Sequence, residues 1–322
     1  MRWHVIVTLT ANPSLDRTAT LPLPLARGGV HRVTSVGVEP GGKGVNVARA
    51  VTLAGHPALA VLPARTGDPL LLGLDALEVP YRAVPVAHLA RTNLTLTEPD
   101  GTTTKINEPG APLGPAEVAD LETAVLGAAE GATWVALCGS LPPGAPQEFY
   151  ARLAHLLRER GHRVAVDTSD APLRALRAAL PDGAPTLLKP NAEELAQLTG
   201  ADPVALESAA AAGDPGPAAA AARGLLAGGV GAVLATLGAA GALLVTDEGA
   251  WVAAPPPITV RSTVGAGDAS LAGYLLAAVA GADPPERLRR AVAYGSAAAA
   301  LPGTALPAPE QTSPGAVVVQ RL

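Results

Sequence analysis

Two glycines and one carboxylate precede an apolar stretch near the C-terminal end of the sequence. The stretch reads Arg261-Ser-Thr-Val-Gly-Ala-Gly-Asp-Ala-Ser-Leu-Ala-Gly-Tyr-Leu-Leu276. Gly265 and Gly267 can take backbone conformations closed to other residues, which predicts a tight turn with Asp268 at the start of a helix. N–H groups at a helix N-terminus bind phosphate or a developing oxyanion, and a nearby carboxylate can accept a proton from a hydroxyl group. An ordinary Asp-capped turn remains the alternative for this stretch alone.

A second glycine pair opens the segment Glu39-Pro-Gly-Gly-Lys-Gly-Val-Asn-Val-Ala-Arg49. Gly41 and Gly42 allow backbone N–H groups to approach a ligand closely, while Lys43 supplies a charge and Asn46 projects from the first turn of the predicted helix. The segment is not a Walker loop, because such a loop needs Ser or Thr after its lysine. A simple strand-to-helix join is the alternative, and it leaves the lysine and the asparagine unexplained.

Residues 83–107 alternate between polar and apolar types around a Pro-Asp-Gly turn, which predicts a β-hairpin. Arg91 and Asn93 share one face by their period-two spacing, and so do Lys105 and Asn107 on the returning strand. Two cations and two amides on one face suit an anionic, hydroxyl-rich ligand. A solvated hairpin face is the alternative.

Lysine is scarce: of 23 basic residues only Lys43, Lys105 and Lys189 are lysines, and the rest are arginines. A lysine that persists in such a chain is expected where a compact point charge is needed and a planar guanidinium does not fit. All three lie in motif-like stretches, although three chance surface lysines would look the same.

The elements that must position these side chains follow an α/β rhythm beyond Gly110. Helices are predicted at 113–130, 147–160 and 171–180, and strands at 134–138, 163–166 and 186–189. This alternation predicts an α/β fold with a mostly parallel sheet and a site along the carboxyl ends of its strands. Four polar residues fall at that edge: Asp167, Lys189, Asn191 and Glu194. They could be helix caps only, but two carboxylates beside a phosphate site would suit Mg²⁺ held mainly through water.

The remaining segments complete the pattern. Residues 1–10 predict a buried first strand, and residues 18–38 predict a small sheet outside the main layers. The low-complexity segment 201–222 is assigned no site. Further on, strands are predicted at 232–237 and 242–245.

The connection between those last two strands, Gly238-Ala-Ala-Gly241, would suit a nucleotide lying over backbone, with Thr236 within reach. A helix rich in small residues is predicted at 291–300. It carries Ser296 and could form one side of an adenine pocket.

Composition excludes several classes of protein. Apolar residues make up 48% and aromatic residues 2%, so the core must be built from Ala, Val and Leu. A net charge of −5 without a basic run argues against a nucleic-acid or anionic-membrane partner. No apolar run is long enough to span a membrane, and the first ten residues lack a signal-peptide layout. The single cysteine, Cys138, suits a reducing cytoplasm.

Taken together, these motifs resemble those of the ribokinase-like sugar kinases, in particular their phosphofructokinase B family. The matching stretches, in chain order, are Thr8–Arg17, Pro40–Ala48, Arg91–Asn93, Gly101–Gly110, Gly139–Gly144, Asp167–Ser169, Lys189–Asn191, Ser262–Asp268 and Gly295–Ala298. Motifs in this order over nearly the whole chain are far more specific than any one of them.

The resemblance implies a three-layer α/β/α sandwich with a mostly parallel sheet and a small β-sheet lid. On this basis we expect residues 1–12, 39–82 and 109–322 to form the nucleotide-binding core, and residues 13–38 and 83–108 to form the lid. The family lid closes over the sugar and often pairs across a homodimer, so a homodimer through the lid is expected.

The implied activity is ATP-dependent phosphorylation of a sugar phosphate, with Mg²⁺. The likeness is greatest to members that convert fructose 1-phosphate to fructose 1,6-bisphosphate. Kinases of tagatose 6-phosphate or fructose 6-phosphate, and a non-catalytic sugar-phosphate-binding regulator, are the alternatives.

The resemblance also implies a role for each matched residue. Asp268 is the expected catalytic base, with the backbone of Gly265, Ala266 and Gly267 as the anion hole. The expected substrate-binding residues are Asp16, Gly41, Gly42, Lys43, Asn46, Arg91, Asn93, Lys105 and Ser140, of which Lys43, Arg91 and Lys105 would hold the existing phosphate. The expected nucleotide-binding residues are Lys189, Asn191, Thr236, Gly238, Gly241, Thr263 and Ser296. Glu194 and Asp167 are expected in the water shell of Mg²⁺.

One departure concerns substrate choice. Lys105 stands where family members that act on fructose 1-phosphate often carry Glu and those that act on fructose 6-phosphate carry Arg. Lys43 in Gly-Gly-Lys-Gly favours the 1-phosphate or tagatose 6-phosphate enzymes.

Overall fold

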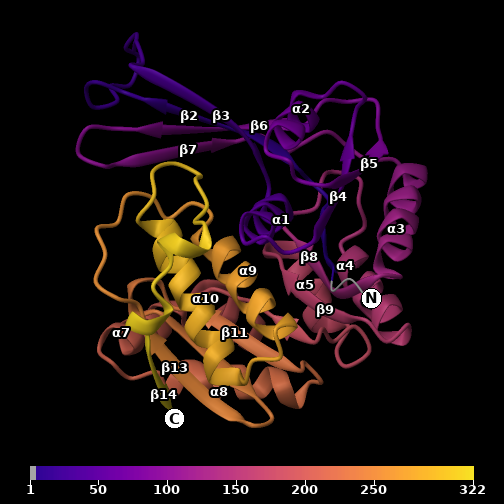
Figure 1. The fold of residues 1–322 in the computed structure, drawn as a ribbon, viewed down its shortest axis with the longest axis vertical. Coiled ribbons are helices and arrows are strands. Elements are labelled where there is room, and N and C mark those ends of the chain that lie inside the picture. Colours follow the sequence, from indigo (N-terminus) through magenta and orange to yellow (C-terminus); the bar gives the residue numbers. More distant parts are fainter. Residues whose placement is uncertain (1–4) are drawn as a thin grey trace.

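A computed structural model describes residues 5–322 of the chain. Part of the predicted first strand, residues 1–4, lies outside the described residues. The remainder forms a large body with a small sheet projecting from it (Figure 1). Within the described residues, no helix has the length and apolar character needed to cross a bilayer.

The body is organised around a ten-stranded sheet whose strands are mostly parallel. In spatial order they are β14 (Val318–Arg321), β13 (Gly249–Ala254), β12 (Ala242–Thr246), β11 (Ala232–Thr236), β10 (Leu187–Leu188), β9 (Arg163–Asp167), β8 (Ala132–Cys138), β1 (Val5–Thr10), β4 (Ala58–Ala64) and β5 (Tyr81–Pro85). The strands from β11 to β14 pair in antiparallel fashion. The carboxyl ends of the parallel strands meet at one edge, where the predicted polar residues lie.

Helices cover both faces of the sheet. Successive strand residues point to opposite faces, and their apolar side chains pack into two separate cores. Val7 and Leu9 of β1 belong to one core, whereas Ile6 belongs to the other. One face carries α3 (Pro115–Ala129), α4 (Phe149–Glu159), α5 (Asp170–Ala178), α6 (Ala192–Thr199), α7 (Pro203–Ala211) and α8 (Gly216–Ala227). The opposite face carries α1 (Lys43–Leu53), α2 (Pro69–Ala76), α9 (Ala266–Val279) and α10 (Pro284–Ala299). The predicted three-layer α/β/α sandwich is confirmed.

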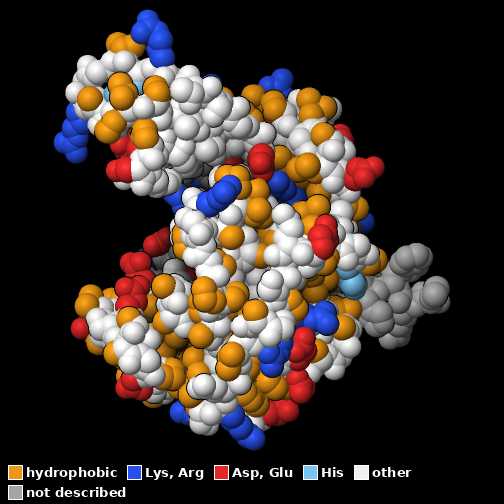
Figure 2. All heavy atoms as spheres, turned by 60° about the vertical axis from the view of Figure 1, so that its left-hand side comes forward, with side chains coloured by type: hydrophobic (Ala, Val, Ile, Leu, Met, Phe, Trp, Pro, Cys, Tyr) orange, Lys and Arg blue, Asp and Glu red, His pale blue; other side chains and the backbone are white. Residues whose placement is uncertain are grey.

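The small sheet has four strands in the order β3 (Ser35–Gly41), β2 (Ser14–Thr20), β6 (Arg91–Thr97) and β7 (Thr103–Asn107). Strands β2 and β6 pair in parallel, and the two outer pairs are antiparallel. We call this sheet the lid. In Figure 2 it overhangs a cleft in the side of the body.

Several elements begin or end away from their predicted positions. Residues 83–85, placed with the lid from their alternation, belong to β5 of the main sheet, because Val84 is buried in the core beside β4 and α3. Residues 39–41, placed with the body, complete the lid strand β3. The last long helix begins at Pro284 and not at 291, since the Asp283 side chain accepts a hydrogen bond from the Glu286 N–H group and caps it there.

Candidate active site

The turn before α9 brings a carboxylate to the positive end of a long helix. Gly265 adopts a left-handed conformation with φ of 77°, and Ala266 begins the helix. Asp268 lies in the first turn and is only 7% exposed. Gly267 leaves room for a lysine, because a Cβ atom there would lie 3.3 Å from Nζ of Lys189. A helix N-terminus with an ammonium group beside it is a suitable site for a phosphoryl group.

Helix α1 supplies the partner of this carboxylate. The Asn46 amide donates a hydrogen bond of 2.8 Å to Oδ2 of Asp268. This contact needs α1 to lie directly on β1, which Gly44 permits: a Cβ atom there would come within 2.6 Å of the Leu9 carbonyl oxygen. Burial raises the pKa of Asp268 to about 6, and the negative charge of Asp167 acts in the same direction. A carboxylate tuned in this way is ionised at neutral pH and still basic enough to accept a proton.

A fully buried carboxylate holds two ammonium groups beside the same turn. Nζ of Lys43 lies 2.7 Å from one oxygen of Asp167, and Nζ of Lys189 lies 3.0 Å from the other. Burial alone would raise the pKa of Asp167, but the two lysines outweigh it and lower this pKa. For Lys43 the signs are reversed: burial alone would lower its pKa, but the surrounding carboxylates outweigh burial and raise this pKa. The result is a positive cluster next to the start of α9.

Glu194 faces this cluster from the start of α6. Its Oε2 accepts the Asn191 N–H group, and Oδ1 of Asn191 accepts the Glu194 N–H group, so the two side chains form a capping box. The other oxygen, Oε1, lies 4.0 Å from Nζ of Lys43. Burial raises the pKa of Glu194. The capping role considered from the sequence is therefore present, with one oxygen left for another partner.

The carboxylates fit a magnesium ion that arrives with phosphate and water ligands. Among residues 5–322, no three His, Cys, Asp or Glu side chains gather as a metal site. Mg²⁺ bound through one or two carboxylates plus substrate phosphates needs no such group. Oε1 of Glu194 makes no hydrogen bond to another described residue and lies 4.0 Å from one lysine, whereas each oxygen of Asp167 lies within 3.0 Å of a lysine.

The lid presents a hydrogen-bonded carboxylate to the same cleft. Oδ1 of Asp16 accepts hydrogen bonds from Ser14 Oγ at 2.7 Å and from Asn93 Nδ2 at 3.0 Å. Gly41 packs against this carboxylate, because a Cβ atom there would lie 2.3 Å from its Oδ2. Gly42 follows with φ of 109° and leads into α1. A sugar hydroxyl group is a natural ligand for such an ordered carboxylate and amide pair.

The predicted cations of the lid hairpin occupy different positions. Strand register places Arg91 beside Ser14 at the base of the lid, and Nη1 of Arg91 donates to the Glu108 carbonyl oxygen at 2.8 Å. Its buried Nε has no partner among the described residues. Lys105 is exposed and lies farther out, on the face that Asn107 and Asn93 share. Arg91 therefore lies at the base of the lid, whereas Lys105 lies on its outer part.

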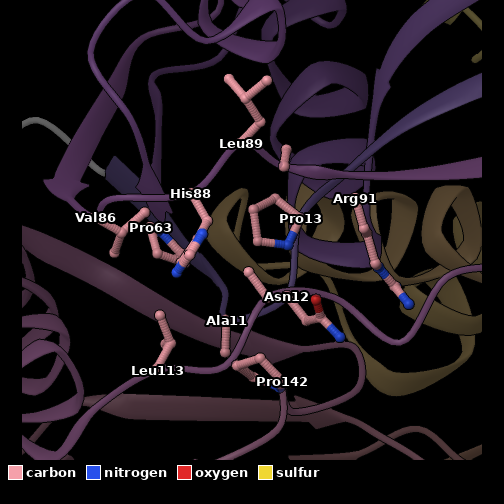
Figure 3. Close-up of a pocket in the computed structure, with 12 residues that line it drawn as sticks. Ala11, Asn12, Pro13, Pro63, Val86, His88, Leu89, Arg91, Leu113 and Pro142 are labelled. Atoms are coloured by element: carbon pink, nitrogen blue, oxygen red, sulfur yellow. The ribbon is translucent and has the colours of Figure 1, made fainter.

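Asn12 lies next to the site but was not among the site residues predicted from the sequence. Its amide donates to the Pro109 carbonyl oxygen at 3.1 Å and to Ser140 Oγ at 3.3 Å. A cavity of about 30 Å³ lies beside it at the junction of lid and body. Figure 3 shows the polar ends of Asn12 and Arg91 extending to the same side of Pro13. Asn12 thus fixes Ser140 next to the lid, and its place two residues after a buried strand was the available signal.

A cavity of about 710 Å³ opens on the other side of the α9 turn. The predicted nucleotide residues that line it are Asn191, Thr236, Gly238, Gly241, Thr263 and Ser296, and the predicted anion-hole residues are Ala266 and Gly267. Its described lining includes no basic side chain. The cavity therefore suits the uncharged end of a nucleotide, with the phosphates directed toward the two lysines.

Two parts of this lining were not predicted. Pro255, Pro256, Pro257, Ile258 and Val260 form an apolar wall, and Glu207 reaches the cavity from α7. Helix α7 lies in the low-complexity segment that was assigned no site. Nothing in its local pattern marks Glu207, because its position depends on how α7 packs beside the turn at 238–240.

Comparison with known proteins identifies the family. The model of the pfkB family carbohydrate kinases matches residues 9–311. The chain is 39% identical to a 1-phosphofructokinase of Rhodobacter capsulatus, covering 95% of this chain and 94% of that protein. It is 37% identical to the ATP-dependent 6-phosphofructokinase isozyme 2 of Escherichia coli, covering 94% of each.

A solved structure agrees with both matches. The crystal structure of phosphofructokinase-2 from Escherichia coli in complex with substrates and products superposes with a TM-score of 0.83 at 35% identity, covering 95% of this chain and 96% of that one. The ribokinase-like fold and the sugar-phosphate kinase class predicted from the motifs are confirmed. The chain belongs to the pfkB family of carbohydrate kinases.

Proposed function

We propose that this kinase transfers the γ-phosphoryl group of ATP to the C6 hydroxyl group of fructose 1-phosphate, giving fructose 1,6-bisphosphate and ADP. The observation that carries the proposal is the buried Asp268, hydrogen-bonded to Asn46 at the start of α9 and flanked by the lysine cluster. The cavity proposed for the nucleotide is lined by Ala266 and Gly267, next to Asp268 in sequence, and the lid strand β3 leads through Gly42 into α1, which carries Asn46.

In this mechanism Asp268 accepts the proton of the attacking hydroxyl group as the oxygen–phosphorus bond forms and the bond to ADP breaks. The N–H groups of Gly265, Ala266 and Gly267 and the ammonium groups of Lys43 and Lys189 stabilise the charge on the transferring group. Glu194 and Asp167 would hold a magnesium ion through water, and the ion would supply positive charge that neutralises the phosphate oxygens.

The sugar phosphate would lie between the lid and α1. Asp16, Asn93 and Asn46 would bind hydroxyl groups, and the backbone of Gly41 and Gly42 would approach the sugar. Arg91, with its unpartnered buried Nε, would hold the existing phosphate together with Ser140 and Lys105. Lys43, whose Nζ lies 2.7 Å from Asp167, is proposed to contact both this phosphate and the transferring phosphoryl group.

Two experiments test this function. Asp268→Asn should abolish phosphoryl transfer while ATP binding persists, and near-native turnover by this variant would refute the assignment of the base. Comparison of kcat/KM for fructose 1-phosphate, tagatose 6-phosphate and fructose 6-phosphate tests the substrate, because the likeness to named 1- and 6-phosphofructokinases is similar. Absence of turnover with all three sugars, despite measurable binding, would instead favour a regulator.

We further propose that two copies pair through the outer face of the lid. Strand register puts Val38, Leu94 and Ile106 on the face opposite Asp16, and Val38 and Ile106 are 57% and 56% exposed. A row of exposed apolar side chains on a small sheet is typical of an interface. A cytoplasmic location, which the single cysteine favours, is part of the same proposal.

A further inference from the structure

The segment that follows α10 connects the end of that helix to the base of the lid. In Figure 1 this segment, drawn in yellow, rises from α10 toward the lid sheet. Thr304 Oγ1 donates a hydrogen bond of 3.1 Å to Oε2 of Glu39 in β3. The neighbouring Gly303 approaches β2 as well, because a Cβ atom there would lie 3.8 Å from Thr18 Oγ1. Two consecutive residues therefore contact two strands of the lid.

The acceptor of this hydrogen bond is itself held in place. Nη2 of Arg49, from α1, lies 2.7 Å from the same Oε2 of Glu39, and Nη1 of Arg49 donates to the Pro40 carbonyl oxygen at 3.0 Å. Arg49 is only 7% exposed. Its ion pair fixes the lid base to α1, and α1 also carries Asn46. The threonine adds a separate connection to the C-terminal part of the chain.

The other end of the segment reaches the turn before α9. Leu306 is 7% exposed, and its Cδ2 lies 3.5 Å from the position of a Cβ atom on Gly265. Thr304, two residues earlier, is also buried, at 6% exposure. One short segment thus contacts the lid base at Thr304 and the turn of the proposed anion hole at Leu306.

The helix that precedes this segment lines the nucleotide cavity. Ser296 and Ala299 of α10 are part of the lining. The Ala299 carbonyl oxygen also accepts the N–H groups of Arg261 and Ser262, at 2.8 Å and 3.2 Å, just before the α9 turn. The cavity wall, the lid base and the α9 turn are therefore connected through residues 296–306.

We infer that Thr304 is a positioning residue, which holds the lid in register with the phosphoryl site through Glu39. The inference rests on the proposed function, since it assumes that the lid carries the sugar phosphate. Because the lid, the anion hole and the nucleotide wall share this segment, binding of the sugar phosphate should tighten nucleotide binding, and the Thr304 hydroxyl group should contribute to that coupling.

Thr304→Val tests the inference, because it removes the hydroxyl group, keeps the shape and leaves the Arg49–Glu39 ion pair intact. Thr312→Val is the matched control: its hydroxyl group also makes one hydrogen bond, to the Pro309 carbonyl oxygen, in the same C-terminal region. We expect Thr304→Val to lower kcat/KM for the sugar phosphate by about two- to tenfold, mainly through KM, with the control unchanged.

Coupling is measured by calorimetry, as the ratio of the dissociation constants of a non-hydrolysable ATP analogue without and with sugar phosphate. This ratio should fall by about two- to tenfold in Thr304→Val. In a double-mutant cycle, Thr304→Val should add little to Glu39→Ala, because Glu39→Ala already removes the acceptor of the Thr304 hydroxyl group together with the partner of Arg49. Kinetics and coupling equal to those of Thr312→Val, or full additivity, would overturn the inference even if the thermal midpoint falls. A wild-type enzyme that phosphorylates no sugar phosphate would instead refute the proposed function.

Discussion

The hydrogen bond from Asn46 to Asp268 should determine the pH at which kcat/KM falls on the acid side, called here the acid limb of the pH profile. Asn46 is buried, and its Oδ1 has no partner in the described part of the chain, so Asn46→Leu removes one donor while keeping volume and excluding water. A hydrogen bond to a charged group contributes about 1.5–3 kcal/mol, and each pKa unit corresponds to about 1.4 kcal/mol. Loss of the donor favours the neutral acid. The pKa of Asp268 should therefore rise from about 6 by about one to two units.

The assay measures kcat/KM for the sugar phosphate from about pH 5 to about pH 9, at saturating MgATP. Titration of the substrate phosphate is the same for every variant, so the difference between profiles reports the enzyme. Asn93→Leu is the matched control, because its amide donates to Asp16 and not to Asp268. It should raise KM without moving the acid limb. An unmoved limb in Asn46→Leu, or an equal shift in both variants, would refute the reasoning.

Four further predictions follow from the same geometry. Gly41→Ala places a methyl group against the Asp16 carboxylate and should raise KM for the sugar phosphate at least about tenfold, measured by steady-state kinetics, with KM for ATP nearly unchanged. In the folded protein the pKa of Asp268 is raised from 3.8 to about 6, so the charged carboxylate destabilises the fold above about pH 6 and has no such effect below about pH 4. Denaturant unfolding at pH 8 should therefore show that Asp268→Asn is more stable than wild type by roughly 3 kcal/mol. This difference should disappear below about pH 4. Asp167→Asn leaves two lysine ammonium groups without their anionic partner and should lower the free energy of unfolding by about 3–5 kcal/mol. It should also lower the pKa of Asp268, and so extend kcat/KM to lower pH, because a negative charge near the base is lost. Val38→Asp on the outer lid face should convert a dimer to a monomer in light scattering without loss of fold, and an unchanged mass would contradict the proposed interface.

Local sequence patterns were sufficient to predict the fold class and most elements. Helices and strands alternate with clear periodicity between residues 113 and 189, and glycine pairs mark the starts of α1 and α9. The exceptions were short segments whose placement depends on packing. Residues 83–85 carry the same alternation as a lid strand, yet Val84 is buried in the main core, so only the tertiary structure distinguishes the two positions.

The charge pairing in the site could not be predicted in the same way. Lys43 and Asp167 are 124 residues apart, and their contact depends on α1 packing over the strand order β9, β8, β1. Sequence reasoning assigned the lysine to the substrate phosphate and the aspartate to the magnesium shell, and it gave no indication that one carboxylate holds two ammonium groups. Those roles stay predictions. Glu207 was missed because an alanine-rich segment has no local feature that marks one side chain as part of a cavity.

The pairing of Asn46 with Asp268 joins positions 222 residues apart. During translation the lid strands β2 and β3 and helix α1 leave the ribosome early, whereas Asp268, the proposed proton acceptor, and the segment after α10 are made last. A prematurely terminated chain that ends before α9 would therefore lack Asp268 and the part of the cavity lining that α9 and α10 supply. Under the proposed function such fragments could not transfer a phosphoryl group, because the proton acceptor is among the last residues to be made.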